Sequence, residues 1–307
     1  MLLGADPEFI VLDYNNNPVN AIKCLKNNKT NPILQNKFYF FHDNVLAEFN
    51  FPPAPSEDIF VKHIKYGLES IQKLICPYKI SFKSAVEFYE PDHKNANFFE
   101  VGCDPDINAY SLKYNKTPED FFKHSLERFA GGHIHVGGKP DDAVCDSLLK
   151  PIFVYMMDLF VGIPSVILDQ SIDAFKRKKV YGQAGTYRPK PYGVEYRVLS
   201  PFWLSNPMTT RLIYRLCEFV FNFMNSGNYE KFWHFNIDKL ASGKPTEAYE
   251  CFGYDPKGVV KAINNNDLDQ AKKYMYFISN FMPEDLFAQI DQIANQTTKD
   301  YQFNWAI

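Results

Sequence analysis

The stretch GGHIHVG, residues 131–137, constrains the fold most strongly, because polar and apolar residues alternate in it between flanking glycines. In a β-strand, residues two apart point to the same face of the sheet. His133 and His135 therefore share one face, and Ile134 and Val136 share the other. The glycines also allow a backbone or a ligand to approach closely. The pattern predicts a strand with one apolar face and one face that carries two imidazoles.

Three other short segments show the same alternation, with polar side chains on one face and apolar side chains on the other. They are GADPEF at 4–9 with Asp6 and Glu8, LAEFNF at 46–51 with Glu48 and Asn50, and GVEYRV at 193–198 with Glu195 and Arg197. Pro7 predicts an edge position or a bulge for the first strand, because proline cannot donate to a β ladder. Four strands of one kind predict a single sheet with a polar face and an apolar face.

The polar face of this sheet carries residue types that suit metal and phosphate chemistry. Carboxylates and imidazoles together suit hard divalent cations such as Mg²⁺ or Mn²⁺, and arginine suits bidentate contact with phosphate oxygens. Taken singly, Asp6 and Glu8 are typical of a solvated strand, and Glu195 and Arg197 of a cross-strand ion pair. The recurrence of such residues on all four strands favours a binding site.

Amphipathic helices are predicted to cover the apolar face. Ser56 is a candidate N-cap for a helix with apolar residues at three- and four-residue steps, and Asn206 precedes another such helix. The segment TPED at 117–120 predicts a third helix start, as a variant of the capping box. Short helices are expected near residues 256–263, 268–278 and 283–293, and the tail at 302–307 is expected to dock through Trp305.

The segment RKKVYGQAGTYRPKPYGVEYR, residues 177–197, combines glycines with five basic residues before Glu195. The glycines predict a looped region of close approach. The basic residues fit either a solvated loop or a clamp on nucleotide phosphates, and the neighbouring Glu195 favours the clamp, because metal-bridged phosphates need both charges. No P-loop and no G-x-G-x-x-G motif is present. The segment CDPDIN at 103–108 fits an active-site turn or a plain surface turn equally well.

Length and composition limit the class of protein. The chain has 307 residues, a formal net charge of −3, 28 Phe and 19 Tyr. This composition excludes a disordered chain, a collagen-like rod and a coiled coil, and the charge argues against a protein whose main task is to coat nucleic acid. The length allows one large domain or about two ordinary ones.

Cysteine spacing and hydropathy predict the compartment. None of the six cysteines forms a C-x-x-C pair, so free thiols in the cytoplasm are expected. Asp6 and Glu8 fall where the apolar region of a signal peptide would lie. The longest apolar stretch, residues 151–168, contains Asp158, Gly162 and Pro164, and it predicts a buried core helix rather than a membrane span.

Five motifs together resemble a known family. They are GADPEF at 4–9, AEFNFPPA at 47–54, GCDPDINAY at 102–110, GGHIHVG at 131–137 and YGQAGTYRPKPYGVEYRVLSPFW at 181–203. They resemble the phage-associated carboxylate–amine ligases of type 2, amidoligase-like members of the glutamine synthetase and glutamate–cysteine ligase superfamily. The resemblance implies an α+β fold, in which a curved, mainly antiparallel sheet has helices packed on one face, as in the glutamine synthetase catalytic domain. It further implies one domain over residues 1–307, with a motif-bearing core at 1–225 and a helical portion at 226–307.

The resemblance also implies ATP and two or three Mg²⁺ ions, or Mn²⁺, on the open face of the sheet. The positions that match metal-binding residues are Asp6, Glu8, Glu48, His133 and Glu195. The positions that match nucleotide-binding residues are Arg177, Arg188, Lys190, Arg197 and His135. The motif does not distinguish which of the two histidines binds the metal and which binds the phosphate. Catalytic roles are expected for Arg197, Arg188, Asp104 and Asp106, with one of the two aspartates as the base. The family usually has E-x-E on the first strand, so Asp6 is a departure that shifts or weakens one metal.

The implied activity is amide formation from a small-molecule or peptide carboxylate and an amine, through an acyl phosphate. Two enzymatic alternatives are an ATP-dependent guanidino or amine kinase on the same fold and a metal-dependent hydrolase that does not use ATP. A third alternative is a non-catalytic phage structural or host-binding protein, but none of the motif acids is missing. We expect no nucleic-acid surface and no membrane contact, and a cytoplasmic location, which is the host cytoplasm if a phage encodes the chain.

Overall fold

A computed structural model describes residues 1–89, 106–116, 121–122, 125–295 and 305 of the chain. Its centre is a large sheet in which every ladder is antiparallel. The strands follow one another across it in the order β3 (Ile33–Gln35), β4 (Phe38–Asp43), β5 (Leu46–Asn50), β1 (Leu2–Leu12), β11 (Gly132–Gly137), β13 (Gly193–Tyr196), β12 (Thr186–Lys190), β8 (Ile107–Asn108) and β9 (Lys113–Tyr114). The end of β1 also pairs with β2 (Pro18–Val19) and β6 (Lys79–Ser81).

The four predicted strands are neighbours in this sheet, in the order β5, β1, β11, β13. The prediction of a single sheet is confirmed. Its edge prediction for β1 is wrong, because β5 and β11 flank the strand on both sides. Pro7 is tolerated there because the ladder between β1 and β5 begins only at the next residue, Glu8, which is paired with Glu48. The missing N–H therefore costs the ladder no hydrogen bond.

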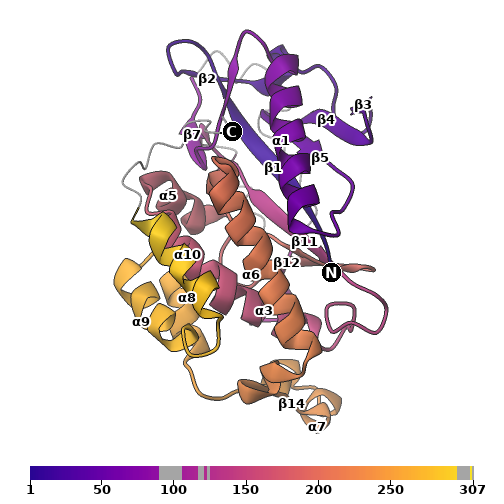
Figure 1. Ribbon diagram of the computed structural model, residues 1–307, viewed down its shortest axis with the longest axis vertical. Helices are drawn as coiled ribbons and strands as arrows, with labels where there is room; N and C mark the ends of the chain where they lie inside the picture. The colour runs from indigo at the N-terminus through magenta and orange to yellow at the C-terminus, as the bar shows by residue number, and fades with distance from the viewer. Residues whose placement is uncertain (90–105, 117–120, 123–124, 296–304, 306–307) are drawn as a thin grey trace.

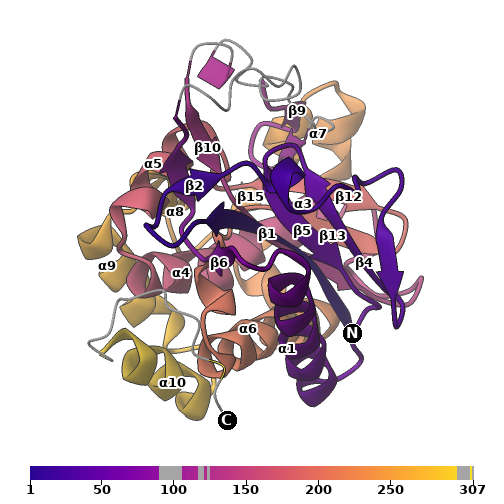
Figure 2. The same ribbon diagram turned by 90° about the horizontal axis from the view of Figure 1, so that it is seen from above.

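Helices cover the apolar face of the sheet and extend beyond it. The helices of the described residues are α1 (Glu57–Leu74), α3 (Lys150–Met157), α4 (Ile163–Leu168), α5 (Ile172–Val180), α6 (Pro207–Asn225), α7 (Ile237–Ala241), α8 (Pro256–Asn264), α9 (Leu268–Ile278) and α10 (Glu284–Ala294). The long helices α1 and α6 lie against one side of the sheet, and α8, α9 and α10 gather beside them (Figures 1 and 2). Short 3₁₀ turns occupy residues 21–23, 201–204, 228–231 and 245–248. The arrangement is α+β, and its likeness to the glutamine synthetase catalytic domain stays a prediction, as does the single domain.

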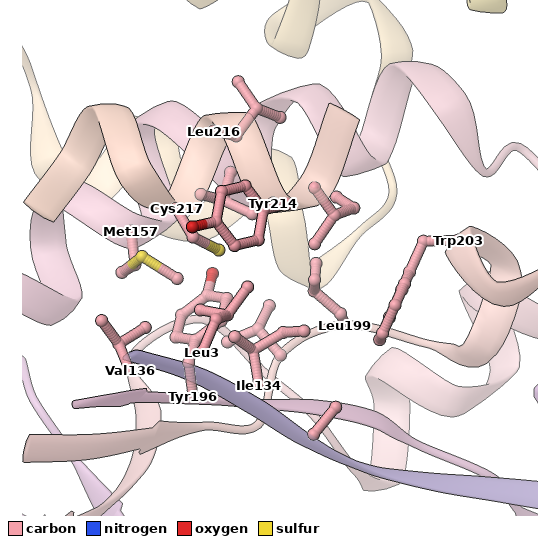
Figure 3. Close-up of a cluster of buried hydrophobic side chains, with 14 of the residues drawn as sticks. Leu3, Ile134, Val136, Met157, Tyr196, Leu199, Trp203, Tyr214, Leu216 and Cys217 are labelled. Carbon is pink, nitrogen blue, oxygen red and sulfur yellow. The ribbon is translucent and has the colours of Figure 1, made fainter. Parts of the chain in front are cut away.

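The main core lies between the sheet and these helices. Figure 3 shows Leu3, Ile134 and Val136 of the sheet facing side chains of α6. All three are fully buried, and burying an aliphatic side chain of this size contributes roughly 1.5–3 kcal/mol. The alternation that predicted the strands therefore also identified the residues that anchor them to the helices.

The helices begin where their capping residues predict. Asn206 accepts a hydrogen bond from the Thr209 amide at 3.0 Å at the start of α6. Ser56 occupies the N-cap position of α1 but makes no side-chain cap hydrogen bond. The three helices expected in the last quarter are confirmed as α8, α9 and α10. Trp305 is buried and donates through Nε1 to the Leu204 carbonyl at 2.8 Å. The helix start predicted at 117–120 lies outside the described residues.

The long apolar stretch forms one continuous helical segment from Lys150 to Leu168. Its middle, Asp158–Gly162, is a π-helical turn between α3 and α4. The segment is long and apolar enough to cross a membrane by composition, but almost all of it is buried inside the protein. The prediction of a core helix is confirmed.

The polar face carries a second, smaller apolar cluster at one end. Ile10 and Leu12 continue the alternation of β1 on the same face as Glu8. They pack with the buried residues Val45, Leu46, Phe88 and Ala130. Phe88 and Ala130 follow the two paired strands β7 (Ala85–Glu87) and β10 (Glu127–Phe129), and β10 lies on the far side of the sheet from α1 and α6 in Figure 2. A further small ladder joins β14 (Trp233–Phe235) and β15 (Tyr249–Cys251). Only the other end of the polar face is therefore available for a site.

Candidate functional site

Three adjacent strands bring Asp6, His135 and Glu195 together on the polar face. One ligand atom of each lies within 4.8 Å of the others. His135 stands directly opposite Glu195 in the ladder between β11 and β13, and its Nε2 lies 2.8 Å from Asp6 Oδ2. The other ring nitrogen, Nδ1, lies 2.6 Å from the Tyr192 hydroxyl. Two carboxylates and an imidazole at this spacing could hold one Mg²⁺ or Mn²⁺ ion.

A second group of carboxylates lies beside this trio. Glu8 and Glu48 are opposite each other in the ladder between β1 and β5, and both are buried. Burial raises the pKa of Glu8 to about 7, and the nearby Asp43 carboxylate adds to the rise while Arg197 opposes it. Burial, followed by the charges of Asp6, Glu8 and Asp43, raises the pKa of Glu48 well above its usual range. A cation between these acids would relieve their mutual repulsion.

Asp43, at the end of β4, is a member of this acid group that the sequence did not reveal. Burial raises its pKa as well. Asp43 is the last residue of the strand FYFFHD. Aromatic residues occur on both faces of this strand, so its sequence lacks the alternation of polar and apolar residues that would have identified Asp43 as a site residue.

Basic side chains surround Glu195. Lys190 Nζ lies 2.8 Å from Glu195 Oε2, Arg188 Nη1 lies 3.2 Å from Glu195 Oε1, and Arg197 donates to the same Oε1. Burial raises the pKa of Glu195, but the charges of Arg197, His135 and Arg188 outweigh burial and lower it to about 2. Glu195 is therefore ionised at every physiological pH, and three cations surround its carboxylate.

Arg197 lies at the centre of the polar face and is almost fully buried. Its Nη1 lies 3.3 Å from His133 Nδ1, its Nε lies 3.4 Å from Asp106 Oδ2, and its Nη2 donates to the Tyr181 hydroxyl. That hydroxyl also lies 3.0 Å from His133 Nε2. Burial and the charges of Arg197 and Arg177 lower the pKa of His133 well below its usual value, so the ring is neutral. His133 therefore faces Arg197 and Tyr181, with its Nδ1 also 3.7 Å from Glu8 Oε1, whereas His135 contacts Asp6 and stands opposite Glu195.

The basic run at 177–179 differs from its prediction. It forms the last turn of α5 instead of a loop, and the alternative of a solvated run is wrong for Arg177 and Lys178, which are buried. Arg177 donates to the carbonyls of Val198 at 2.8 Å and Arg197 at 3.2 Å. Lys178 donates to those of Val198 at 2.6 Å and Gly182 at 2.9 Å. Both cations thus hold the backbone that follows β13, and a phosphate contact for Arg177 stays a prediction.

The loop prediction is confirmed for the residues between α5 and β12. Gly182 and Gly185 there have φ angles of +67° and +77°, which side chains with a Cβ rarely adopt. Of the two candidate bases, Asp104 lies outside the described residues. Asp106 is half-buried, accepts from Asn115 Nδ2 at 2.8 Å, and lies beside Arg197.

The polar face is more closed than the open surface that we expected. Glu8, Glu48 and Glu195 are each exposed by 7% or less. The side chains of Asp6 and Lys190 are exposed by 21% and 30%. Ion pairs and hydrogen bonds satisfy the polar groups internally, which is what makes their burial tolerable. Ligands would reach the acids from the side of Asp6 and Lys190.

Comparison with known proteins agrees with the resemblance seen in the motifs. Residues 124–254 match the family model described as "Phage phiEco32-like COOH.NH2 ligase-type 2". The matched range contains β11, β12 and β13, and with them His135, Glu195 and Arg197, whereas the acids of β1 and β5 precede it. The family name indicates an enzyme that joins a carboxylate to an amine. No curated protein matches the chain.

Proposed function

We propose that this chain is an ATP- and Mg²⁺-dependent carboxylate–amine ligase that forms an amide bond through an acyl phosphate. One observation carries the proposal. Asp6, His135 and Glu195 lie within ligand distance of one another, with buried acids on one flank and the cations around Glu195 on the other. A metal-bound triphosphate needs acids that hold the metal ions and cations that contact the phosphates.

The residues present fit divalent cations. Asp6, His135 and Glu195 supply oxygen and nitrogen ligands for one ion, and Glu8 and Glu48 supply oxygens for a second. The raised pKa values of Glu8 and Glu48 show that this acid group binds protons when no cation neutralises it. When bound, the ions would offset the negative charge of the phosphates.

The cations of β12 and β13 would stabilise phosphoryl transfer. A substrate carboxylate oxygen forms a bond to the γ-phosphorus of ATP while the bond to the ADP oxygen breaks. Arg188 and Arg197 donate to the phosphoryl oxygens, on which charge accumulates. Their present bonds to Glu195 hold both guanidinium groups on the polar face in advance, so little reorganisation is needed.

Amide formation needs a base. The amine nitrogen attacks the acyl carbon, phosphate leaves with the bonding electrons, and the nitrogen loses a proton. Asp106 is the described carboxylate outside the metal acids that lies next to the phosphate-binding arginine, with its Oδ2 3.4 Å from Arg197 Nε. For this reason we assign Asp106 as the base that accepts the proton from the amine nitrogen.

The test is incubation of the purified protein with Mg·ATP and pools of carboxylates and amines, followed by mass spectrometry. A product that equals two pool members minus water, formed together with ADP, supports the ligase. ADP with a phosphorylated amine or guanidine and no condensed product indicates the kinase instead. No ADP in any pool refutes the proposal. Glu195→Gln should abolish turnover, and Glu230→Gln, the same change at an exposed position in the 3₁₀ turn at 228–231 away from the sheet, serves as the control.

A further inference from the structure

Asp158 is a buried carboxylic acid that the proposed reaction does not use. It lies in the π-helical turn between α3 and α4 and is fully buried. This position is on the helix side of the sheet, opposite the polar face. A buried carboxyl group lowers the stability of the fold unless hydrogen bonds or ion pairs compensate for its lost hydration. In addition, π-helical turns occur often at functional sites. Both features indicate that Asp158 has a task other than packing.

A tyrosine of the motif strand β13 contacts Asp158. The Tyr196 hydroxyl donates to Asp158 Oδ1 at 2.7 Å. The second oxygen, Oδ2, and the Tyr110 hydroxyl are both buried and make no hydrogen bond of ordinary geometry within the described residues. Burial, and after it the Asp158 charge, raise the pKa of Tyr110 well above its usual value. Burial raises the pKa of Asp158 to about 7, while Tyr196, Tyr110 and Lys178 oppose that rise.

Each tyrosine belongs to a segment that also carries a residue of the polar face. Tyr196 stands between Glu195 and Arg197 on β13, so its side chain points to the opposite face from theirs. Tyr110 lies in the turn after β8, and Asp106 directly precedes the same strand. On the polar face, the same two segments are joined by the ion pair between Arg197 and Asp106.

We propose that Asp158 is a positioning residue that holds Tyr196 from behind the sheet and thereby sets Glu195 and Arg197 relative to Asp106. The hydrogen bond to Tyr196 restrains β13 from the helix side. Its loss would let β13 shift, and metal ligands tolerate distance errors of only about 0.2 Å. The expected effect on metal binding rests on the proposed function, but the expected effect on the mobility of β13 does not.

The test compares Asp158→Leu, which removes the carboxylate acceptor at similar volume, and Tyr196→Phe with Tyr187→Phe as a matched control. Tyr187 is also a buried tyrosine, and it stands directly opposite Tyr196 in the ladder between β12 and β13. The first readout is amide hydrogen exchange of residues 193–197, corrected for global stability, which needs no ligand. The second is the dissociation constant for Mn²⁺ alone. Outer partners of metal ligands typically contribute 10–100-fold to metal affinity.

We expect both variants to speed exchange at residues 193–197 and to weaken Mn²⁺ binding by about 10-fold. The double variant should be no weaker than the worse single variant, because both changes break one contact. Tyr187→Phe should leave both readouts unchanged. Unchanged exchange in Asp158→Leu and Tyr196→Phe overturns the inference, as does an additive double variant. Faster exchange in a protein that never binds Mn²⁺ refutes the proposed metal site but supports the positioning role.

Discussion

Replacing Glu8 by glutamine should make the metal-free protein more stable. Glu8 is 7% exposed, the buried Glu48 stands opposite it in the ladder, and the half-buried Asp43 lies nearby. A glutamine has nearly the same shape and can still accept the hydrogen bond that the Gly131 amide donates to Glu8 Oε2 at 2.6 Å. It cannot ionise, so it removes a buried negative charge from a group of like charges.

The magnitude follows from the pKa. The pKa of Glu8 rises from the ordinary 4.5 to about 7 in the folded protein. Each unit corresponds to about 1.4 kcal/mol, so ionisation costs the folded state about 3 kcal/mol. Because the folded pKa is the higher one, the stability contribution is complete below pH 4.5 and is lost as pH rises through about 7. Glu8→Gln should therefore gain up to about 3 kcal/mol at pH 8 and less than about 1 kcal/mol at pH 5.

The assay is urea unfolding at pH 5 and pH 8, in EDTA and then in excess Mg²⁺ or Mn²⁺. The wild-type protein should be stabilised by the cation and the variant much less so, because ligand binding to the folded state alone raises stability. Functional sites commonly lower the stability of the folded protein in this way.

Glu195→Gln is the matched control with the opposite sign. The pKa of Glu195 is lowered to about 2, so its ionised form stabilises the fold above pH 4.5 and loses that contribution as pH falls through 2. This variant should lose about 3 kcal/mol at pH 8. A Glu8→Gln protein that is less stable than wild type at pH 8 in EDTA would refute the electrostatic reasoning.

Three further predictions concern the scaffold, each read from urea or thermal unfolding. Asn206→Ala should cost about 1 kcal/mol through loss of its N-cap bond, whereas Ser56→Ala should be nearly neutral because Ser56 makes no such bond; equal effects would contradict this. Gly67→Ala should destabilise by about 1–3 kcal/mol, since an added Cβ would overlap the Phe49 ring; a neutral result would mean that the ring can move aside. Trp305→Phe should cost about 1–3 kcal/mol, because it leaves a buried carbonyl without its indole donor; an unchanged midpoint would show that the docking contributes no stability.

Much of the scaffold was predictable because its signals are local. The period of two in GGHIHVG determines which side chains share a face, whatever lies beyond the strand. The cap at Asn206 and the apolar spacing of the last three helices act within one or two turns. The docking of Trp305 was predictable because tryptophan is highly buried on average.

Residues whose role depends on distant segments were missed or misjudged. Asp43 joins the acid group only because β4 pairs with β5. Arg177 and Lys178 have the composition of a solvated run, yet the end of α5 faces the carbonyls after β13, and those carbonyls satisfy both cations inside the protein. Asp158 was noted only as a charge that argued against a membrane span.

By itself, the sequence determined the strands, their two faces, the helix starts and the set of polar residues on one face, because each depends on neighbours within a few positions. Only the tertiary structure decided that β5, β1, β11 and β13 are adjacent in that order, that His135 rather than His133 joins Asp6 and Glu195, and that the polar face is largely buried. The physical reason is that pairing order, burial and electrostatic coupling arise from contacts between segments far apart in the chain. Those contacts are also what separate the pKa of Glu8 from that of Glu195, although both are glutamates on the same face of one sheet.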